Sequence, residues 1–306
     1  MPDVWFPFLG IEFDHLDRVF LSIGNFEIAW YGFLIMLGFL TGFLLCMRIA
    51  KKSGQNTDNY FDFFIYAVIG GIIGARLYYV IFSWDYYSQN PGEIVKIWHG
   101  GLAIYGGVIM DIIIAFFFTR HRKMNFWRLL DTCLPCVAIG QAIGRWGNFM
   151  NQEAFGGYTE SLFAMRLNVQ TAYYLPLELL EKAITVNGTT YIQVHPTFLY
   201  ESFGCLVVLA VMLIIWKHKK FDGEIACTYF IGYGIVRALI EPLRTDQLLL
   251  WNTKIPISVL VSCGLILIGT VMLILLARKH KKTIPAEAVR TAENGEAEPE
   301  INEENQ

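Results

Sequence analysis

The chain has 306 residues, of which 55% are hydrophobic and 17% charged, and its mean hydropathy is +0.43. A soluble globular domain carries about 25% charged residues, so this composition excludes an ordinary soluble protein and predicts a polytopic membrane protein. The formal net charge is −3, and Glu287 to Gln306 alone hold seven Glu and one Arg. We expect no nucleic-acid partner, because basic residues nowhere gather with interleaved aromatic residues.

Apolar runs near the length that crosses a bilayer, roughly 20 helical residues for ~30 Å of hydrocarbon, recur along the chain. Only helices and closed barrels satisfy their backbone polar groups in lipid, and runs of this length are helical. We therefore predict an all-α polytopic membrane protein with seven transmembrane helices. These helices are expected over residues 26–48, 60–83, 102–119, 126–145, 197–216, 224–243 and 255–277.

Basic residues follow every second predicted helix. The connections 84–101 and 146–196 are poor in Lys and Arg, whereas basic clusters follow the first, third, fifth and seventh helices. Because Lys and Arg are enriched on the cytoplasmic side, the N-terminus is predicted outside and the C-terminus inside. The basic clusters are Arg48, Lys51 and Lys52; Arg120, Arg122 and Lys123; Lys217, Lys219 and Lys220; and Arg278, Lys279, Lys281 and Lys282.

The sequence predicts two regions. Residues 1–283 form a transmembrane domain that includes the outer segment 146–196, and this segment and residues 1–25 are expected to form a small extracytoplasmic cap. Residues 284–306 are polar and lack aromatic side chains. Such a composition cannot bury enough apolar surface to fold, so we predict a disordered acidic cytoplasmic tail.

Charged residues lie within or at the ends of the apolar runs, where a charge is costly and commonly marks function. On the sixth predicted helix, Tyr233, Arg237, Glu241 and Arg244 share one face, because their spacing is i, i+4, i+8, i+11. The predicted topology brings these side chains to the outer half of the membrane. Other members of this outer group are Gln141, Arg145 and Asn148 on the fourth helix, and His99, His195 and Glu201 at helix starts, while Arg76 lies near the end of the second helix.

The cations in this group are predicted to outnumber their partners. Glu241 can pair with Arg237 within one helix, but one glutamate cannot also neutralise Arg145 and Arg244. Surplus guanidinium groups predict an anionic ligand, and arginine suits bidentate contacts with phosphate. A phospholipid head group is the natural candidate. His99, beside Gly100 and at the membrane surface, is placed to move protons.

Several common catalytic centres are missing from the sequence. It has no Gly-x-Ser-x-Gly elbow, no His-Glu-x-x-His zinc pair and no phosphate-binding loop. Cys133-Leu-Pro-Cys136 has the spacing of a redox motif but lacks its βαβ context, so these cysteines are predicted to be packing residues. The residues thus favour phospholipid head-group chemistry without a metal, a cofactor or an enzyme nucleophile.

Residues 144–156 follow the pattern Gly-Arg-x-Gly-Asn-Phe-x-Asn-x-Glu-x-x-Gly, and through it the chain resembles the prolipoprotein diacylglyceryl transferase family. The resemblance covers nearly all of the membrane portion. Its other pieces are Trp30-Tyr-Gly32, Gly74-Ala-Arg76, Trp98-His-Gly-Gly101, His195-Pro-Thr-Phe-Leu-Tyr-Glu201 and Tyr233-Gly-Ile-Val-Arg237 with Glu241 and Arg244.

The resemblance implies a bacterial inner-membrane enzyme with its active site toward the extracytoplasmic side. Its substrates would be phosphatidylglycerol, drawn from the membrane lipids, and the lipobox cysteine of preprolipoproteins. The diacylglyceryl group moves to the cysteine thiol, a thioether forms and glycerol phosphate leaves, as the first step of lipoprotein maturation. The thiolate is the reactive form, so the enzyme must accept a proton and stabilise the leaving phosphate.

The resemblance also implies roles for the residues singled out above. Arg145 and Arg237 would stabilise the phosphate, and His99 would take the thiol proton, with Glu153 as the alternative base. Supporting positions would be filled by Glu241, Arg244, His195, Glu201 and Arg76. The head group would be bound by Arg145, Asn148, Tyr31, Tyr233, Glu153 and Gly156.

Two other functions compete with the transferase. A transporter or channel for an anionic lipid would use the same arginines for binding alone, but such proteins commonly show broken helices or an inverted repeat, and the chain shows no convincing repeat. A seven-helix receptor would share the topology and leave the deep arginines and the pattern at residues 144–156 unexplained.

Overall fold

The structure is a computed structural model that describes residues 2–24, 26–172, 175–250, 253 and 255–295, and it is mostly helical. Among these residues, five helices are long and apolar enough to cross a membrane, as expected of a multi-pass membrane protein. They are α1 (Trp30–Lys52), α2 (Thr57–Phe82), α4 (Ile104–His121), α7 (Thr197–Lys217) and the apolar part, to Lys282, of α9 (Ile257–Gly295).

Two further long helices, α5 (Phe126–Met150) and α8 (Glu224–Ile240), lie where the sequence predicts the fourth and sixth spans. α8 has 17 residues, and α5 combines polar residues with an internal proline, Pro135. Both helices carry arginines of the predicted site. The shorter helical turns are α3 (Trp84–Tyr87), η1 (Pro91–Glu93), η2 (Ile97–His99), α6 (Leu177–Leu180) and η3 (Glu241–Leu243).

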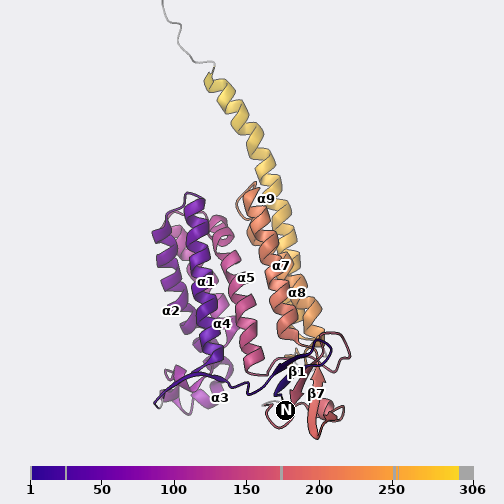
Figure 1. Ribbon diagram of the computed structural model, residues 1–306. Coiled ribbons are helices and arrows are strands. Elements are labelled where there is room, and N and C mark those ends of the chain that lie inside the picture. The colour runs from indigo at the N-terminus through magenta and orange to yellow at the C-terminus, as the bar shows by residue number, and fades with distance from the viewer. Residues whose placement is uncertain (1, 25, 173–174, 251–252, 254, 296–306) are drawn as a thin grey trace, which may run out of the picture.

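α5 is the central helix of the bundle. It packs against α1 on one side and against α7 and α8 on the other, while α2 packs on α4 and α8 on α9. Figure 1 shows α5 between the group α1, α2 and α4 and the group α7, α8 and α9. α1 and α5 approach closely because Gly42 has no side chain: a Cβ there would lie 2.8 Å from the carbonyl oxygen of Cys136.

The helix starts are capped by side chains that the sequence provides at the right positions. Asn56 accepts a hydrogen bond from the Asp58 amide at the start of α2, and Asn125 accepts one from the Trp127 amide at the start of α5. α8 is capped from another helix, because the buried carboxylate of Asp131 accepts from the amides of Gly223 and Ala226 at 2.7 and 2.9 Å.

The prediction of an all-α chain was wrong, because the described residues contain two antiparallel sheets, one within the segments assigned to the cap and one that also includes residues 26–29. The five-stranded sheet has the order β2-β1-β5-β7-β6, and the two-stranded sheet pairs β3 with β4. The prediction relied on long apolar runs, and strands of three to six residues do not produce such runs. They are β1 (Val4–Phe6), β2 (Ile11–Phe13), β3 (Val19–Ile23), β4 (Phe26–Ala29), β5 (Met165–Asn168), β6 (Ile184–Val186) and β7 (Thr189–Val194).

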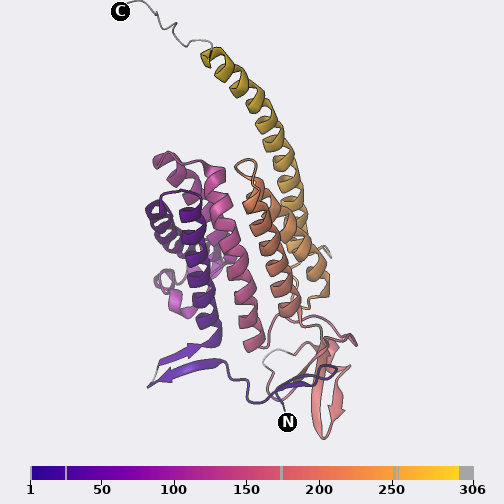
Figure 2. The ribbon, with the colours of Figure 1, turned by 45° about the horizontal axis from the view of Figure 1, so that its top comes forward.

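The five-stranded sheet lies at one end of the bundle, beside the N-terminus and beneath α7 and α8 (Figure 2). We call this end the cap end. Alternate residues of β1, β5 and β7, among them Val4, Leu167 and Ile192, form a core with Phe149 of α5 and Phe198 of α7. Through this shared core the sheet packs against the ends of the two helices that carry Arg145 and Glu201.

Two helix boundaries differ from the predicted ones. The first helix begins at Trp30 rather than at residue 26, because residues 26–29 form β4. α9 continues to Gly295, and therefore extends into the segment that was predicted to be disordered. Ala, Glu and Arg recur there, and these residues favour helix even without a packing partner. Residues 296–306 of the predicted tail lie outside the described residues.

Candidate active site

The last turn of α5 presents Arg145 and Asn148 on one face. Arg145 Nη1 donates to Asn148 Oδ1 at 3.3 Å, and Asn148 Nδ2 donates to Glu153 Oε1 at 3.1 Å. The chain reverses beyond the helix through Gln152 and Ala154, whose φ angles of 51° and 55° lie in the left-handed region. This unfavourable backbone folds Glu153 back onto the helix end, as strained backbone often does at functional sites.

Glu201 lies in the first turns of α7 and joins three helices. Its side chain is 1% exposed, and its Oε1 lies 2.8 Å from Arg145 Nη2 and 2.8 Å from Arg237 Nη1. Its Oε2 lies 3.6 Å from Arg244 Nη1. One buried carboxylate therefore holds guanidinium groups from α5, α8 and the segment after α8 in a single cluster.

Two more carboxylates complete the pairing of this cluster. Arg237 Nη2 lies 2.6 Å from Glu241 Oε2, four residues further along the chain. Arg244 Nε and Nη2 donate to the two oxygens of Asp246 at 2.9 and 2.7 Å. Burial by itself would raise the pKa of Asp246, but the Arg244 guanidinium holds it below its ordinary value.

We call Arg145, Arg237, Arg244, Glu201, Glu241 and Asp246 the arginine–carboxylate cluster. It contains three guanidiniums and three carboxylates, so its formal charges balance. The sequence-based expectation of surplus cations was wrong for this reason. It omitted Asp246, which lies in a loop, and it did not anticipate that Glu201 faces the arginines. A ligand therefore has to compete for N–H groups that carboxylates partly occupy.

Gly156 and His195 form the backbone frame that supports Arg244. The Gly156 amide donates to the His195 carbonyl at 2.9 Å, and the Gly157 amide donates to the Leu243 carbonyl at 2.8 Å. A Cβ at Gly156 would lie 2.7 Å from the Leu243 oxygen, so the crossing requires glycine. Burial lowers the pKa of His195. The structure thus places Gly156, predicted to contact the head group, at a backbone crossing.

The two predicted tyrosines line different parts of this region. Tyr31 packs against Gly147, where a Cβ would lie 2.6 Å from its ring. Tyr233 stacks on Tyr229 with ring centroids 5.6 Å apart, and the Tyr229 hydroxyl donates to Gln141 Oε1 at 3.1 Å. Tyr229 was missed by the sequence analysis, although it precedes Tyr233 by one helical turn on the same face.

His99 lies in the loop between α2 and α4. Its Nδ1 lies 2.8 Å from Glu93 Oε2, and its side chain is 55% exposed. Over the described residues, no hydrogen bond or ion pair joins His99 to the arginine–carboxylate cluster. The structure therefore does not bring this predicted residue to the other predicted residues, and Glu93 is a partner that the sequence analysis missed.

Arg76 holds the same loop in place. Its buried guanidinium donates to five backbone carbonyls, at distances between 2.6 and 3.4 Å, and it lies 5.2 Å from the Tyr87 ring centroid. Arg76 is thus a structural centre for residues 93–101 and separate from the arginine–carboxylate cluster. The carbonyls belong to Glu93, Ile94, Lys96, Gly100 and Gly101.

Comparison with known proteins identifies the family. Residues 18–275 match the family model described as prolipoprotein diacylglyceryl transferase. Three relatives that bear the name phosphatidylglycerol–prolipoprotein diacylglyceryl transferase are similar to the chain. The protein of Finegoldia magna is 41% identical over 88% of this chain and 98% of its own length. That of Halalkalibacterium halodurans is 41% identical (83% and 85%), and that of Staphylococcus aureus strain MRSA252 is 40% identical (87% and 90%). The chain therefore belongs to the prolipoprotein diacylglyceryl transferase family.

Proposed function

We propose that the chain transfers the diacylglyceryl group of phosphatidylglycerol to the lipobox cysteine of preprolipoproteins, the first step of lipoprotein maturation. The cysteine sulfur forms a bond to the glyceryl carbon, and the bond from that carbon to the phosphate oxygen breaks. The oxygen keeps the electron pair and leaves as glycerol phosphate. Membership of the family supports this reaction, and the names of the relatives state both substrates.

One observation carries the mechanism: Arg145 and Arg237 meet at a single oxygen of Glu201. Their side chains remain 23% and 17% exposed, and no hydrogen bond among the described residues uses the Nε of either arginine. The leaving phosphate can therefore bind between two cations that are already in position. Fixed donors of this kind stabilise charge in the transition state without reorganisation.

Neighbouring side chains would orient the head group. Asn148 is fixed by Arg145 and Glu153, while Tyr31 and Tyr233 contribute hydroxyls as hydrogen-bond donors. Glu241 and Arg244 hold Arg237 and Glu201 in place, respectively. Gly156 contributes as the glycine that lets residues 155–157 approach His195 and Leu243 rather than through a direct contact with the lipid.

The thiol proton has two candidate acceptors. His99 binds the Glu93 carboxylate through Nδ1, which leaves Nε2 to accept a proton. A movement of the loop or of the substrate would then have to bring the thiol to His99. Glu153 is closer to the arginines, but its Oε1 already accepts hydrogen bonds from the amides of Asn148 and Asn151.

We propose the following placement in the membrane. α1, α2, α4, α5, α7, α8 and α9 span the bacterial inner membrane, with the N-terminus and the cap outside. The alternation of basic connections supports this orientation. The arginine–carboxylate cluster then faces the extracytoplasmic side. There it can meet both phosphatidylglycerol from the surrounding lipids and the lipobox of a secreted substrate.

The test is transfer in proteoliposomes that contain phosphatidylglycerol and a lipobox peptide, with the product detected by mass spectrometry. We expect the peptide to gain one diacylglyceryl unit. The gain should disappear with a Cys-to-Ser peptide and with Arg145→Ala enzyme that inserts normally. Arg166→Ala, which removes a cap arginine that contacts Gln193 and Trp5, is the control. Folded wild-type protein that yields no thioether would refute the transferase and favour lipid transport.

A further inference from the structure

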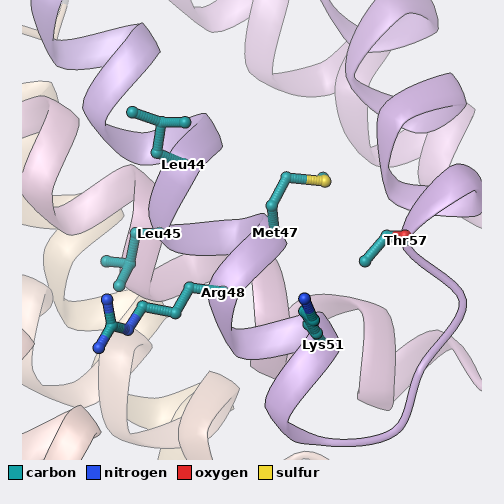
Figure 3. A pocket seen from close by; sticks show the side chains of 6 residues that line it. All are labelled: Leu44, Leu45, Met47, Arg48, Lys51 and Thr57. Atoms are coloured by element: carbon teal, nitrogen blue, oxygen red, sulfur yellow. The ribbon is translucent and has the colours of Figure 1, made fainter.

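The end of the bundle opposite the cap contains a pocket that the proposed reaction does not use. The pocket has a volume of about 610 Å³ and lies at the end of α1 and the start of α2. Figure 3 shows the side chains that line it. In the proposed orientation this end of the bundle meets the cytoplasmic leaflet. The lining residues are Leu44, Leu45, Met47, Arg48, Lys51 and Thr57.

The lining changes from apolar to cationic along α1. Leu44, Arg48 and Lys51 are spaced i, i+4, i+7 and therefore share one helix face. Lys51 lies about 10 Å further along the helix axis than Leu44, since each residue rises 1.5 Å. Leu44 is 58% exposed, on a surface that faces lipid in the proposed orientation. The face thus offers an apolar surface for an acyl chain, followed by two cations at the depth of the phosphates.

The two cations of the pocket have no carboxylate partner among the described residues. Three other basic residues at this end are paired: Arg122 with Asp62, Arg128 with Asp222, and Lys219 with both Asp131 and Asp222. Within the described part of the chain, Lys52, Lys217 and Lys220 also enter no ion pair, but they do not line this pocket. Arg48 and Lys51 are exposed and appear in none of these ion pairs. Alternation of charge explains why basic residues are at this end, but it does not explain why two of them flank a pocket with an apolar wall.

We propose that this pocket binds an acidic phospholipid of the cytoplasmic leaflet, with its phosphate beside Arg48 and Lys51. The Thr57 side chain on α2 lines the other side of the pocket, and an acyl chain lies along Leu44. Basic pockets between transmembrane helices on the cytoplasmic side suit such head groups. The proposal rests on the proposed membrane orientation and not on the transfer reaction. The pocket lies at the end of the bundle opposite the cap, whereas the arginine–carboxylate cluster lies at the cap end.

The test uses phosphatidylglycerol with a photoreactive diazirine near its head group, in phosphatidylcholine nanodiscs that contain the full chain. After irradiation, peptide mapping by mass spectrometry locates the lipid. We expect labelling of residues 44–57, and Arg48→Gln/Lys51→Gln should reduce that labelling on the order of tenfold. Lys217→Gln/Lys220→Gln removes the same charge at the same end and should leave the labelling within about twofold.

The matched photoreactive phosphatidylcholine should label residues 44–57 on the order of tenfold less than phosphatidylglycerol. Equal labelling by the two lipids, or full labelling of Arg48→Gln/Lys51→Gln, would overturn the proposal. Inorganic phosphate that displaces the lipid probe would also overturn it, because the site would then bind a free anion. The readout is labelling and not turnover, so protein that fails to transfer diacylglyceryl still tests this pocket.

Discussion

Glu201→Gln is the substitution that most directly tests the arginine–carboxylate cluster. The amide keeps the size of the side chain but removes the negative charge, and Arg145 and Arg237 then lie on either side of a neutral oxygen. Each guanidinium nitrogen is 2.8 Å from Glu201 Oε1. With charge centres ~4 Å apart and an effective dielectric constant of ~20, each lost attraction is about 4 kcal/mol before desolvation is counted.

Desolvation offsets much of this attraction, so the net cost is smaller. Removal of one partner from a buried ion pair typically costs about 3–5 kcal/mol, and this range fits Glu201, whose side chain is 1% exposed. One kcal/mol shifts the unfolding temperature of a large domain by roughly 2–4 °C. We therefore expect the unfolding midpoint of purified Glu201→Gln protein to fall by about 6–20 °C.

Transfer should fall as well, by about 10²-fold, because Arg145 and Arg237 would no longer be held in position, and loss of one fixed donor for the developing charge has an effect of that size. The assays are a thermal unfolding scan in detergent and the proteoliposome transfer measured well below the lowered midpoint. Glu178→Gln, which neutralises an exposed carboxylate in the cap, is the control for charge alone. A midpoint within about 2 °C of wild type together with normal transfer would show that Glu201 does not hold the cluster together.

Three further predictions follow from the site. Gly156→Ala should abolish most transfer, because its Cβ must displace Leu243 and with it Arg244. Gly157→Ala is the control and should be neutral, since nothing lies within 4 Å of its Cβ. Equal transfer by the two variants would show that the close approach of Gly156 to Leu243 does not position Arg244. Burial lowers the pKa of His195 below its ordinary value of 6.5, so the unfolded chain binds this proton more readily and native stability should decline as pH falls through 6.5 towards the lowered pKa. Thermal unfolding scans between pH 6.5 and the lowered pKa should show a smaller loss of stability in His195→Gln than in the wild type. An equal loss in both proteins would show that His195 does not cause the pH dependence. If His99 takes the thiol proton, the transfer defect of His99→Ala should become smaller above pH ~9, where a free thiol ionises by itself. If instead the defect of His99→Ala does not change with pH and the defect of Glu153→Gln becomes smaller, Glu153 is the proton acceptor.

Much of the helical bundle could be predicted from the sequence. Each of the seven long helices in the described part of the chain overlaps a predicted span, because an apolar run long enough to cross lipid satisfies its backbone polar groups as a helix. The family could also be predicted, from the spacing of polar residues between 144 and 156. The match of residues 18–275 to the family model confirms that prediction.

The cap shows where sequence reasoning failed. β1 and β2 contain three residues each, and β1 pairs with β5, which is more than 150 residues away in the sequence. Strands of this length carry almost no periodic signal, and their pairing is decided by the core that they share with Phe149 and Phe198. No local pattern could have predicted the sheet order.

For the site, the sequence by itself determined which chemical groups are available: arginines at the ends of α5 and α8, carboxylates nearby and a histidine in the loop between α2 and α4. Only the tertiary structure decided how they pair. It placed Glu201 at 2.8 Å from both Arg145 and Arg237, brought Asp246 onto Arg244 and kept His99 with Glu93. The physical reason is that a guanidinium pairs with the carboxylate that the packing of separate helices brings close to it. The distance between two side chains on different helices cannot be obtained from their spacing along the sequence.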